Sequence, residues 1–133
     1  MKPMPSNVKR SLPIGTTMQT CDNSGAKIVK LISVKNLKTV KKRPQSAGVG
    51  DLVVVSVVKG IKEIRKELVP AVIVRQKKEY SRPDGTRIKF LDNSAVVLKD
   101  EKGNPRGTIF KGPIAKEAAD RWPGISKVAS IVV

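Results

Sequence analysis

Short apolar runs rich in β-branched residues, separated by turn residues, constrain the fold of this chain more than any other feature. The clearest are residues 52–58, 71–74 and 95–98. Their length and branching favour buried β-strands over helices. The near-continuous apolar character of residues 52–58 indicates burial on both faces. The sequence therefore predicts a mainly β core.

Two further strands are expected nearer the N-terminus, at residues 16–21 and 26–35. The tight turn Asp22-Asn23-Ser24-Gly25 would join them as a hairpin. Residues 59–68 are polar and contain Gly60, which favours a connecting loop over a helix. Short strands with turn signals at this spacing predict a small closed barrel.

One helix is predicted near the C-terminus. Gly112-Pro113 would begin it, with proline at the first helical position, and Pro123-Gly124 would end it. The apolar positions at four-residue steps on one face are Ile114, Ala118 and Trp122. We interpret Trp122 as the residue that packs this face against the barrel.

A length of 133 residues predicts a single domain with a real core. Residues 1–12 have no periodicity and are expected to form an irregular basic arm. The barrel would occupy residues 13–100, and residues 101–133 a loop followed by a short helical C-terminal part. We expect the apolar residues 131–133 to be held against the core.

The charge balance points to an anionic partner. The chain carries 27 Lys and Arg against 11 Asp and Glu, a net charge of +16 with a pI near 10.4. Such a charge costs self-repulsion in the free protein. Polyphosphate binding gains from counterion release, so nucleic acid is the favoured partner. A membrane partner is disfavoured, because no basic amphipathic helix is visible. No small-molecule substrate is expected.

Two cationic segments are candidates for phosphate contact. Residues 41–43 lie in a loop with no acid nearer in the sequence than Asp51. Residues 75–89 separate two predicted strands, and the turn signal Pro83-Asp84-Gly85 predicts a hairpin there. Alternation along a two-stranded ribbon places several cations on one face. The candidates are Lys41, Lys42, Arg43, Arg75, Lys77, Lys78, Arg82, Arg87 and Lys89.

A third cationic segment is interpreted differently. Between residues 59 and 67, acids alternate with the cations, which favours an ordinary solvated loop. The residues concerned are Lys59, Lys62, Glu63, Arg65, Lys66 and Glu67.

The scarcity of aromatic residues decides the expected style of recognition. Single-strand binders present several aromatic side chains on which bases stack, and this chain has only Tyr80, Phe90, Phe110 and Trp122. Recognition of folded RNA through its backbone and shape fits better. The alternative, a free-standing barrel that binds single strands, would depend on Tyr80 or Phe90.

Enzymatic chemistry is disfavoured. The chain has no histidine, which removes the commonest general base and most zinc sites. Its one cysteine, Cys21, could be a nucleophile only with an unusual base, and we expect it to be a small, partly buried hydrophobe at the end of a strand. An RNA-processing enzyme would need a metal-binding carboxylate cluster among Asp22, Asp51 and Asp92. No cofactor or metal is expected. The lack of a disulfide pair, a signal peptide or a spanning segment favours the cytosol.

Several ordered motifs make the chain resemble the universal large-subunit ribosomal protein family numbered fourteen (L-fourteen). The family signature is matched by residues 71–74, Asp84-Gly85, Phe90, Asn93 and Val96-Val97. Further landmarks are residues 21–26, 47–51 and 111–114. The arm and the hairpin look like the archaeal or eukaryotic type, and the resemblance covers nearly all of residues 15–133.

This resemblance implies a five-stranded, OB-like β-barrel with a short C-terminal helical region, in a structural protein of the cytoplasmic large ribosomal subunit. The implied partners are large-subunit rRNA, small-subunit rRNA at intersubunit bridges, neighbouring large-subunit ribosomal proteins and the anti-association initiation factor. Carried onto this sequence, it assigns the nine candidate cations to rRNA contact. It also implies a bridge- and protein-facing surface at Arg106, Lys111, Lys116 and Arg121.

Overall fold

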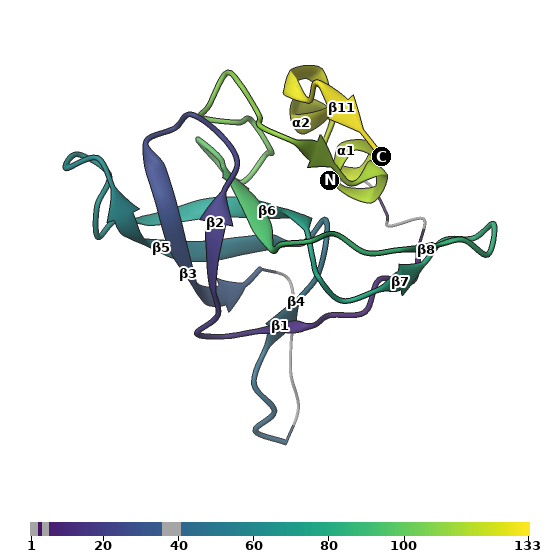
Figure 1. Ribbon diagram of the computed structural model, residues 1–133. Helices are drawn as coiled ribbons and strands as arrows, with labels where there is room; N and C mark the ends of the chain where they lie inside the picture. The colour runs from purple at the N-terminus through teal and green to yellow at the C-terminus, as the bar shows by residue number, and fades with distance from the viewer. Residues whose placement is uncertain (1–2, 4–5, 36–40) are drawn as a thin grey trace.

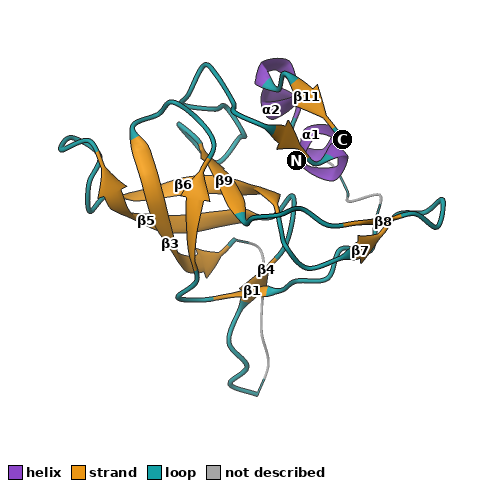
Figure 2. Cartoon of the chain, in the orientation of Figure 1, coloured by secondary structure: helices purple, strands orange, loops and turns teal. Residues whose placement is uncertain are grey.

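The computed structural model describes residues 3, 6–35 and 41–133, so parts of the predicted arm and of the loop before Lys41 lie outside the described residues. Its centre is a closed five-stranded barrel, which confirms the mainly β fold class (Figures 1 and 2). The barrel strands are β2 (Thr17–Thr20), β3 (Ala26–Val34), β5 (Leu52–Gly60), β6 (Leu68–Arg75) and β9 (Ser94–Val97).

The barrel strands follow the order of the chain, and each is antiparallel to the next. With five alternating strands, the first and the last point the same way. The closing pair is therefore parallel, with Gln19 opposite Ser94 and Thr20 opposite Ala95.

The apolar runs of the sequence supply the barrel core. Residues 71–74 of β6 are buried at four consecutive positions, and so are all four residues of β9. Consecutive burial means that both faces of these strands are covered, in contrast to a half-exposed strand. One face of β6 lines the barrel, while the C-terminal segment packs close by, with the Ala115 amide donating to the Val74 carbonyl at 3.1 Å.

Three small two-stranded sheets flank the barrel. They pair β1 (Leu12–Pro13) with β4 (Ser46–Ala47), β7 (Tyr80–Ser81) with β8 (Arg87–Ile88), and β10 (Pro113–Ile114) with β11 (Ile131–Val132).

The sheet β7–β8 is the predicted hairpin, and its turn has the expected chemistry. Gly85 adopts a φ of 93°, in the left-handed region that glycine tolerates. The Asp84 carboxylate accepts hydrogen bonds from the amide and the hydroxyl of Thr86. The hairpin projects to the right in Figure 1.

The predicted single helix from Pro113 to Trp122 is wrong at its start, and it misses a second helix that follows its end. Pro113 begins strand β10, and the helices are α1 (Lys116–Arg121) and α2 (Pro123–Val128). A residue before proline avoids the helical region, and Trp122 is extended, with φ −124° and ψ 95°. Pro123 then occupies the first helical position of α2, so it starts a helix where the sequence predicted an end.

Trp122 packs as predicted, but the tail does not. The indole is 1% exposed, and its Nε1 donates to the Gly50 carbonyl at 2.8 Å. The backbone of the tail is held by the parallel pairing of β11 with β10, while the side chains of residues 131–133 are about half exposed and not part of the core. Among the described residues, neither helix has the length and apolar character needed to cross a membrane.

Candidate nucleic-acid interface

The loop that carries residues 41–43 lies between β3 and β4 and projects from the barrel at the bottom of Figure 1. All three side chains are exposed. Lys41 and Lys42 adopt φ angles of 53° and 59°, a left-handed conformation that lysine rarely takes. The ion pairs found between described residues include none of the three.

The hairpin and its flanks present a second set of cations. Lys77, Lys78 and Lys89 are exposed and take part in no ion pair within the described part of the chain. Arg87 is also exposed, and its Nε lies 2.5 Å from Oε1 of Glu79. A surface pair of this kind contributes at most about 1 kcal/mol, so it can be exchanged for a phosphate contact.

Arg82 differs from its neighbours because it is used inside the protein. Its Nε lies 2.7 Å from Oε1 of Glu117, which is 2% exposed, and its Nη2 donates to the Val133 carbonyl at 2.6 Å. Tyr80 donates to the same carboxylate. Burial alone would raise the pKa of Glu117, but the hydrogen bonds from Arg82 and Tyr80 hold that pKa below its usual value.

Arg75 is likewise enclosed by protein groups. Its Nε lies 3.3 Å from Oδ1 of Asp92, and its Nη2 donates to the Ser94 hydroxyl at 2.9 Å. A Cβ at Gly112 would lie 2.3 Å from Nη1 of Arg75, so the glycine leaves room for the guanidinium. Of the nine predicted contact residues, Arg75 and Arg82 are thus held internally, and the other seven are exposed.

The predicted C-terminal surface divides in a similar way. Lys111 and Lys116 are exposed, and no ion pair between described residues includes them. Arg106 forms an ion pair, with its Nη1 3.9 Å from Oε2 of Glu67. Arg121 turns inward. Its Nη1 lies 3.3 Å from Oδ1 of Asp51.

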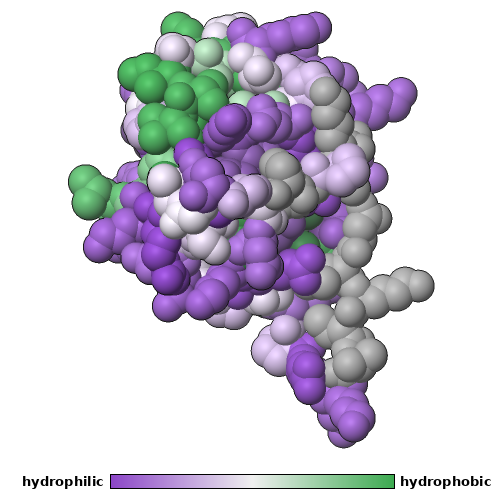
Figure 3. Space-filling view, turned by 90° about the vertical axis from the view of Figure 1, so that its right-hand side faces the viewer, coloured by the Kyte–Doolittle hydropathy of each residue, from purple (hydrophilic) through white to green (hydrophobic). Residues whose placement is uncertain are grey.

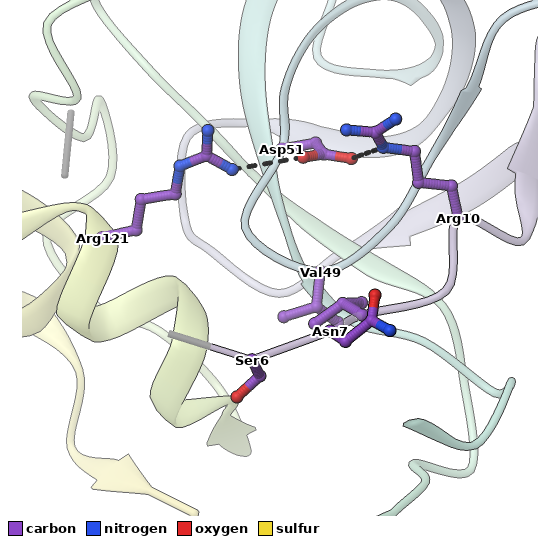
Figure 4. A pocket seen from close by; sticks show the side chains of 7 residues that line it. Ser6, Asn7, Arg10, Val49, Asp51 and Arg121 are labelled. Carbon is purple, nitrogen blue, oxygen red and sulfur yellow. Dashed lines mark hydrogen bonds and ion pairs between the residues drawn. The ribbon is translucent and has the colours of Figure 1, made fainter. Parts of the chain in front are cut away.

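Arg121 and Arg10 reach Asp51 from opposite sides of a hollow of about 470 Å³ (Figure 4). The Arg10 Nε lies 3.8 Å from Oδ2 of Asp51. This carboxylate therefore joins the N-terminal segment, the start of β5 and helix α1, and its charge is already balanced. The hollow is a structural junction between these elements.

The carboxylates that an RNA-processing enzyme would need are dispersed among separate partners. Asp22 accepts a hydrogen bond from the Val97 amide at 2.9 Å, while Asp51 and Asp92 pair with arginines. Among the described residues, no group of three His, Cys, Asp or Glu side chains could hold a metal ion.

The environment of Cys21 disfavours catalysis by its thiol, and the burial of the aromatic residues disfavours base stacking. Burial raises the pKa of the Cys21 thiol to about 12, so it stays protonated and is a poor nucleophile. Tyr80 is completely buried, and Phe90 packs partly buried against the core. The tyrosine therefore provides no platform for base stacking.

Sequence reasoning did not find two buried polar residues that hold this region together. Glu117 binds the hairpin, and Gln76 bridges three segments. The Gln76 Oε1 accepts from the Val49 amide at 3.0 Å, and its Nε2 donates to the carbonyls of Lys9 and Lys78. The only sequence signal for either is a polar side chain at the end of an apolar run or within an alanine-rich helix.

Comparison with known proteins gives a consistent match. The family model described as ribosomal protein L14p/L23e matches residues 11–133. The large ribosomal subunit protein uL14 of Nanoarchaeum equitans is 53% identical over the whole of both chains. The proteins of the same name from Methanococcus vannielii and Methanococcus maripaludis are 53% and 52% identical over 99% of each chain.

Proposed function

The chain belongs to the family of ribosomal protein L14p/L23e, and from this premise we propose that it binds large-subunit rRNA through its exposed loops and lies at the subunit interface. As a member of this family it is a structural constituent of the large ribosomal subunit, in the cytoplasm, and not an enzyme.

The observation that carries the rRNA proposal is a set of exposed cations on two projecting segments, which no ion pair within the described residues balances. Neutralising phosphates with such side chains releases counterions and contributes most of the binding free energy. Arg87 can join them by leaving Glu79. The proposed phosphate contacts are Lys41, Lys42, Arg43, Lys77, Lys78, Arg87 and Lys89.

Arg75 and Arg82 have a different place in this proposal. Both contact acids of the same chain: Arg82 holds the hairpin to α1 through Glu117, and Arg75 holds the end of β6 to the segment before β9 through Asp92. They are therefore not among the proposed phosphate contacts.

The subunit-interface part of the proposal rests on the C-terminal surface. The side chains of Ile131, Val132 and Val133 are about half exposed there. The face of the molecule shown in Figure 3 carries an apolar patch within a mostly hydrophilic surface. Exposed apolar groups rimmed by polar ones are typical of protein contacts. The proposed occupants are neighbouring ribosomal proteins and the anti-association initiation factor. The amide of Lys116 donates to the Val133 carbonyl, so this lysine lies beside the apolar residues. We propose Lys116 and Arg106 as contacts for small-subunit rRNA.

Sedimentation tests the proposal directly. The tagged chain should co-migrate with large subunits after a moderate salt wash and should bind deproteinised large-subunit rRNA in a salt-dependent manner. Recovery only in the soluble fraction would contradict it. A free single-strand binder would instead prefer unstructured oligonucleotides and would lose binding in Phe90→Ala.

A further inference from the structure

Three segments that are distant in sequence meet on the side of the barrel away from the hairpin β7–β8 (Figure 1). They are residues 21–25, residues 59–61 at the end of β5, and residues 107–111. The Ile61 amide donates to the Gly25 carbonyl at 3.0 Å, and the Lys111 amide donates to the Cys21 carbonyl at 2.6 Å. Their relative positions are therefore fixed by backbone hydrogen bonds.

Side-chain contacts reinforce this junction. The Asn23 Oδ1 accepts hydrogen bonds from the amides of Thr108, at 2.8 Å, and Ile109, at 3.3 Å. At Gly25, whose φ is 100°, an added Cβ would lie 2.7 Å from the Ile61 side chain. Because these contacts hold the three segments together, they form one continuous surface in the free protein.

The junction forms a groove of about 490 Å³. Each of the three segments, or the strand that follows it, contributes one lysine to its lining: Lys27, Lys59 and Lys111. Ile28 and the half-exposed Ile61 supply apolar surface. A second hollow of about 400 Å³ adjoins it, shares Lys27 and Lys59, and adds Arg65.

The positive charge of this groove is not balanced locally. No ion pair between described residues includes any of its four cations. The one acid in the lining, Asp22, is buried and accepts from the Val97 amide and the Ser24 hydroxyl. Both carboxylate oxygens of Asp22 therefore accept hydrogen bonds from the protein itself.

We propose that this groove is a second RNA-binding site, which takes a stretch of sugar–phosphate backbone on the side of the barrel away from the hairpin. Cations that line two adjoining hollows suit an extended polyanion better than a small anion, which needs donors that converge on one point. The apolar surface of Ile28 and Ile61 can contact ribose. The inference rests on the proposed function, because both sites take large-subunit rRNA.

This site changes two assignments made from the sequence. Lys59 and Arg65, interpreted there as part of a solvated loop, become ligands of RNA. Lys111 belongs to the groove rather than to the C-terminal surface, because Lys27 and Lys59 are the cations that line the same hollow. With both sites occupied, the rigid barrel would hold two RNA segments at a fixed separation.

A triple variant, Lys27→Ala with Lys59→Ala and Lys111→Ala, tests the proposal on deproteinised large-subunit rRNA. Each phosphate contact contributes about 0.7 to 0.9 to the slope of log K against log salt. The slope should therefore become shallower by about two to three in the triple variant. All three side chains are exposed, so the thermal unfolding temperature should not change.

The matched control replaces three exposed lysines that line neither hollow, Lys99, Lys102 and Lys127, and so removes the same charge. The slope of log K against log salt for this control variant should stay close to that of the unmodified protein. Ile61→Glu, which adds a carboxylate to the groove without removing a lysine, should weaken rRNA binding as the triple variant does.

A hairpin variant, Lys77→Ala with Lys78→Ala and Lys89→Ala, separates the two proposals. If the salt slope becomes shallower only in the hairpin variant, the groove inference is overturned and the proposed function stands. If the salt slope becomes shallower only in the groove variant, the groove is supported and the proposed hairpin contacts are refuted. If it becomes shallower in neither variant, both proposals fail. Binding of a polyglutamate peptide that depends on the three groove lysines, with an unchanged rRNA slope, would assign the groove to an acidic protein segment and overturn the RNA proposal.

Discussion

The hydroxyl of Tyr80 donates a 2.6 Å hydrogen bond to Oε2 of Glu117, which ties the base of the hairpin to the first turn of α1. The other carboxylate oxygen accepts from Arg82 and, at 3.2 Å, from Ser6. One buried acid thus joins the N-terminal segment, the hairpin and the helix.

Replacing Glu117 with Ala should lower the free energy of unfolding by about 2–4 kcal/mol, because it leaves a buried hydroxyl and a mostly buried guanidinium without their acceptor. Urea denaturation measures this change. Asp120→Ala, an exposed position on the same helix, is the control and should cost less than about 0.5 kcal/mol. Equal effects of the two variants would contradict the role given to Glu117.

Acid should weaken the same cluster. The pKa of Glu117 in the folded protein lies below its ordinary value of 4.5, so its contribution is present above that value and is lost as the pH falls through the folded pKa. The gap in unfolding temperature between the wild type and Glu117→Gln should therefore be wide at neutral pH and narrow below 4.5. A gap independent of pH would show that the carboxylate is not ionised in the folded protein.

Arg82 and Arg87 should behave differently although they lie on the same hairpin. Arg87→Ala should make the rRNA salt slope shallower by about one and leave stability unchanged, because it removes one phosphate contact. Arg82→Ala should lower the free energy of unfolding by about 1–3 kcal/mol with the slope of the folded protein unchanged. Filter binding and urea denaturation on both variants separate the two roles, and a reversed pattern would refute this assignment.

Trp122→Phe should lower the free energy of unfolding by about 1–3 kcal/mol, because it leaves the Gly50 carbonyl with only the longer, 3.4 Å hydrogen bond from Arg121 and removes part of a buried ring. Circular dichroism follows the transition, since the variant has no tryptophan fluorescence. Leu91→Ala serves as the control, as that side chain is 94% exposed. No difference between them would mean that the indole does not fix α1 and α2 on the barrel.

The barrel could be predicted because short stretches of the sequence are enough to identify its strands. Residues 52–58 and 71–74 are short, branched and apolar, and the hairpin turn is set by Pro83, Asp84 and Gly85. The end of α1 before Pro123 was predictable too, but the start of α2 at Pro123 was not, because proline is compatible with both the end and the start of a helix. Only the extended conformation of Trp122 decides between these.

The roles of the individual cations could not be predicted from the sequence around them, because the partners that hold them lie in distant segments. Arg82 and Arg87 look alike in the sequence, but the acid that holds Arg82 lies 35 residues away. The acids near Lys59 suggested local neutralisation, yet Glu67 lies beside Arg106. Charge balance in a folded chain depends on which segments meet, and that is a property of topology.

The parallel pairing of β2 with β9 also governs how this protein can be made. The five strands follow one another as antiparallel neighbours, and β2 has no second partner until β9 exists, so a nascent chain cannot close its barrel before β9 has been added. Until then, the edges of β2 and β6 remain open to pairing with other chains. Contacts between such distant segments form late and slowly. Premature termination just before β9 should therefore yield an aggregating fragment, because the barrel closes only when β9 is present.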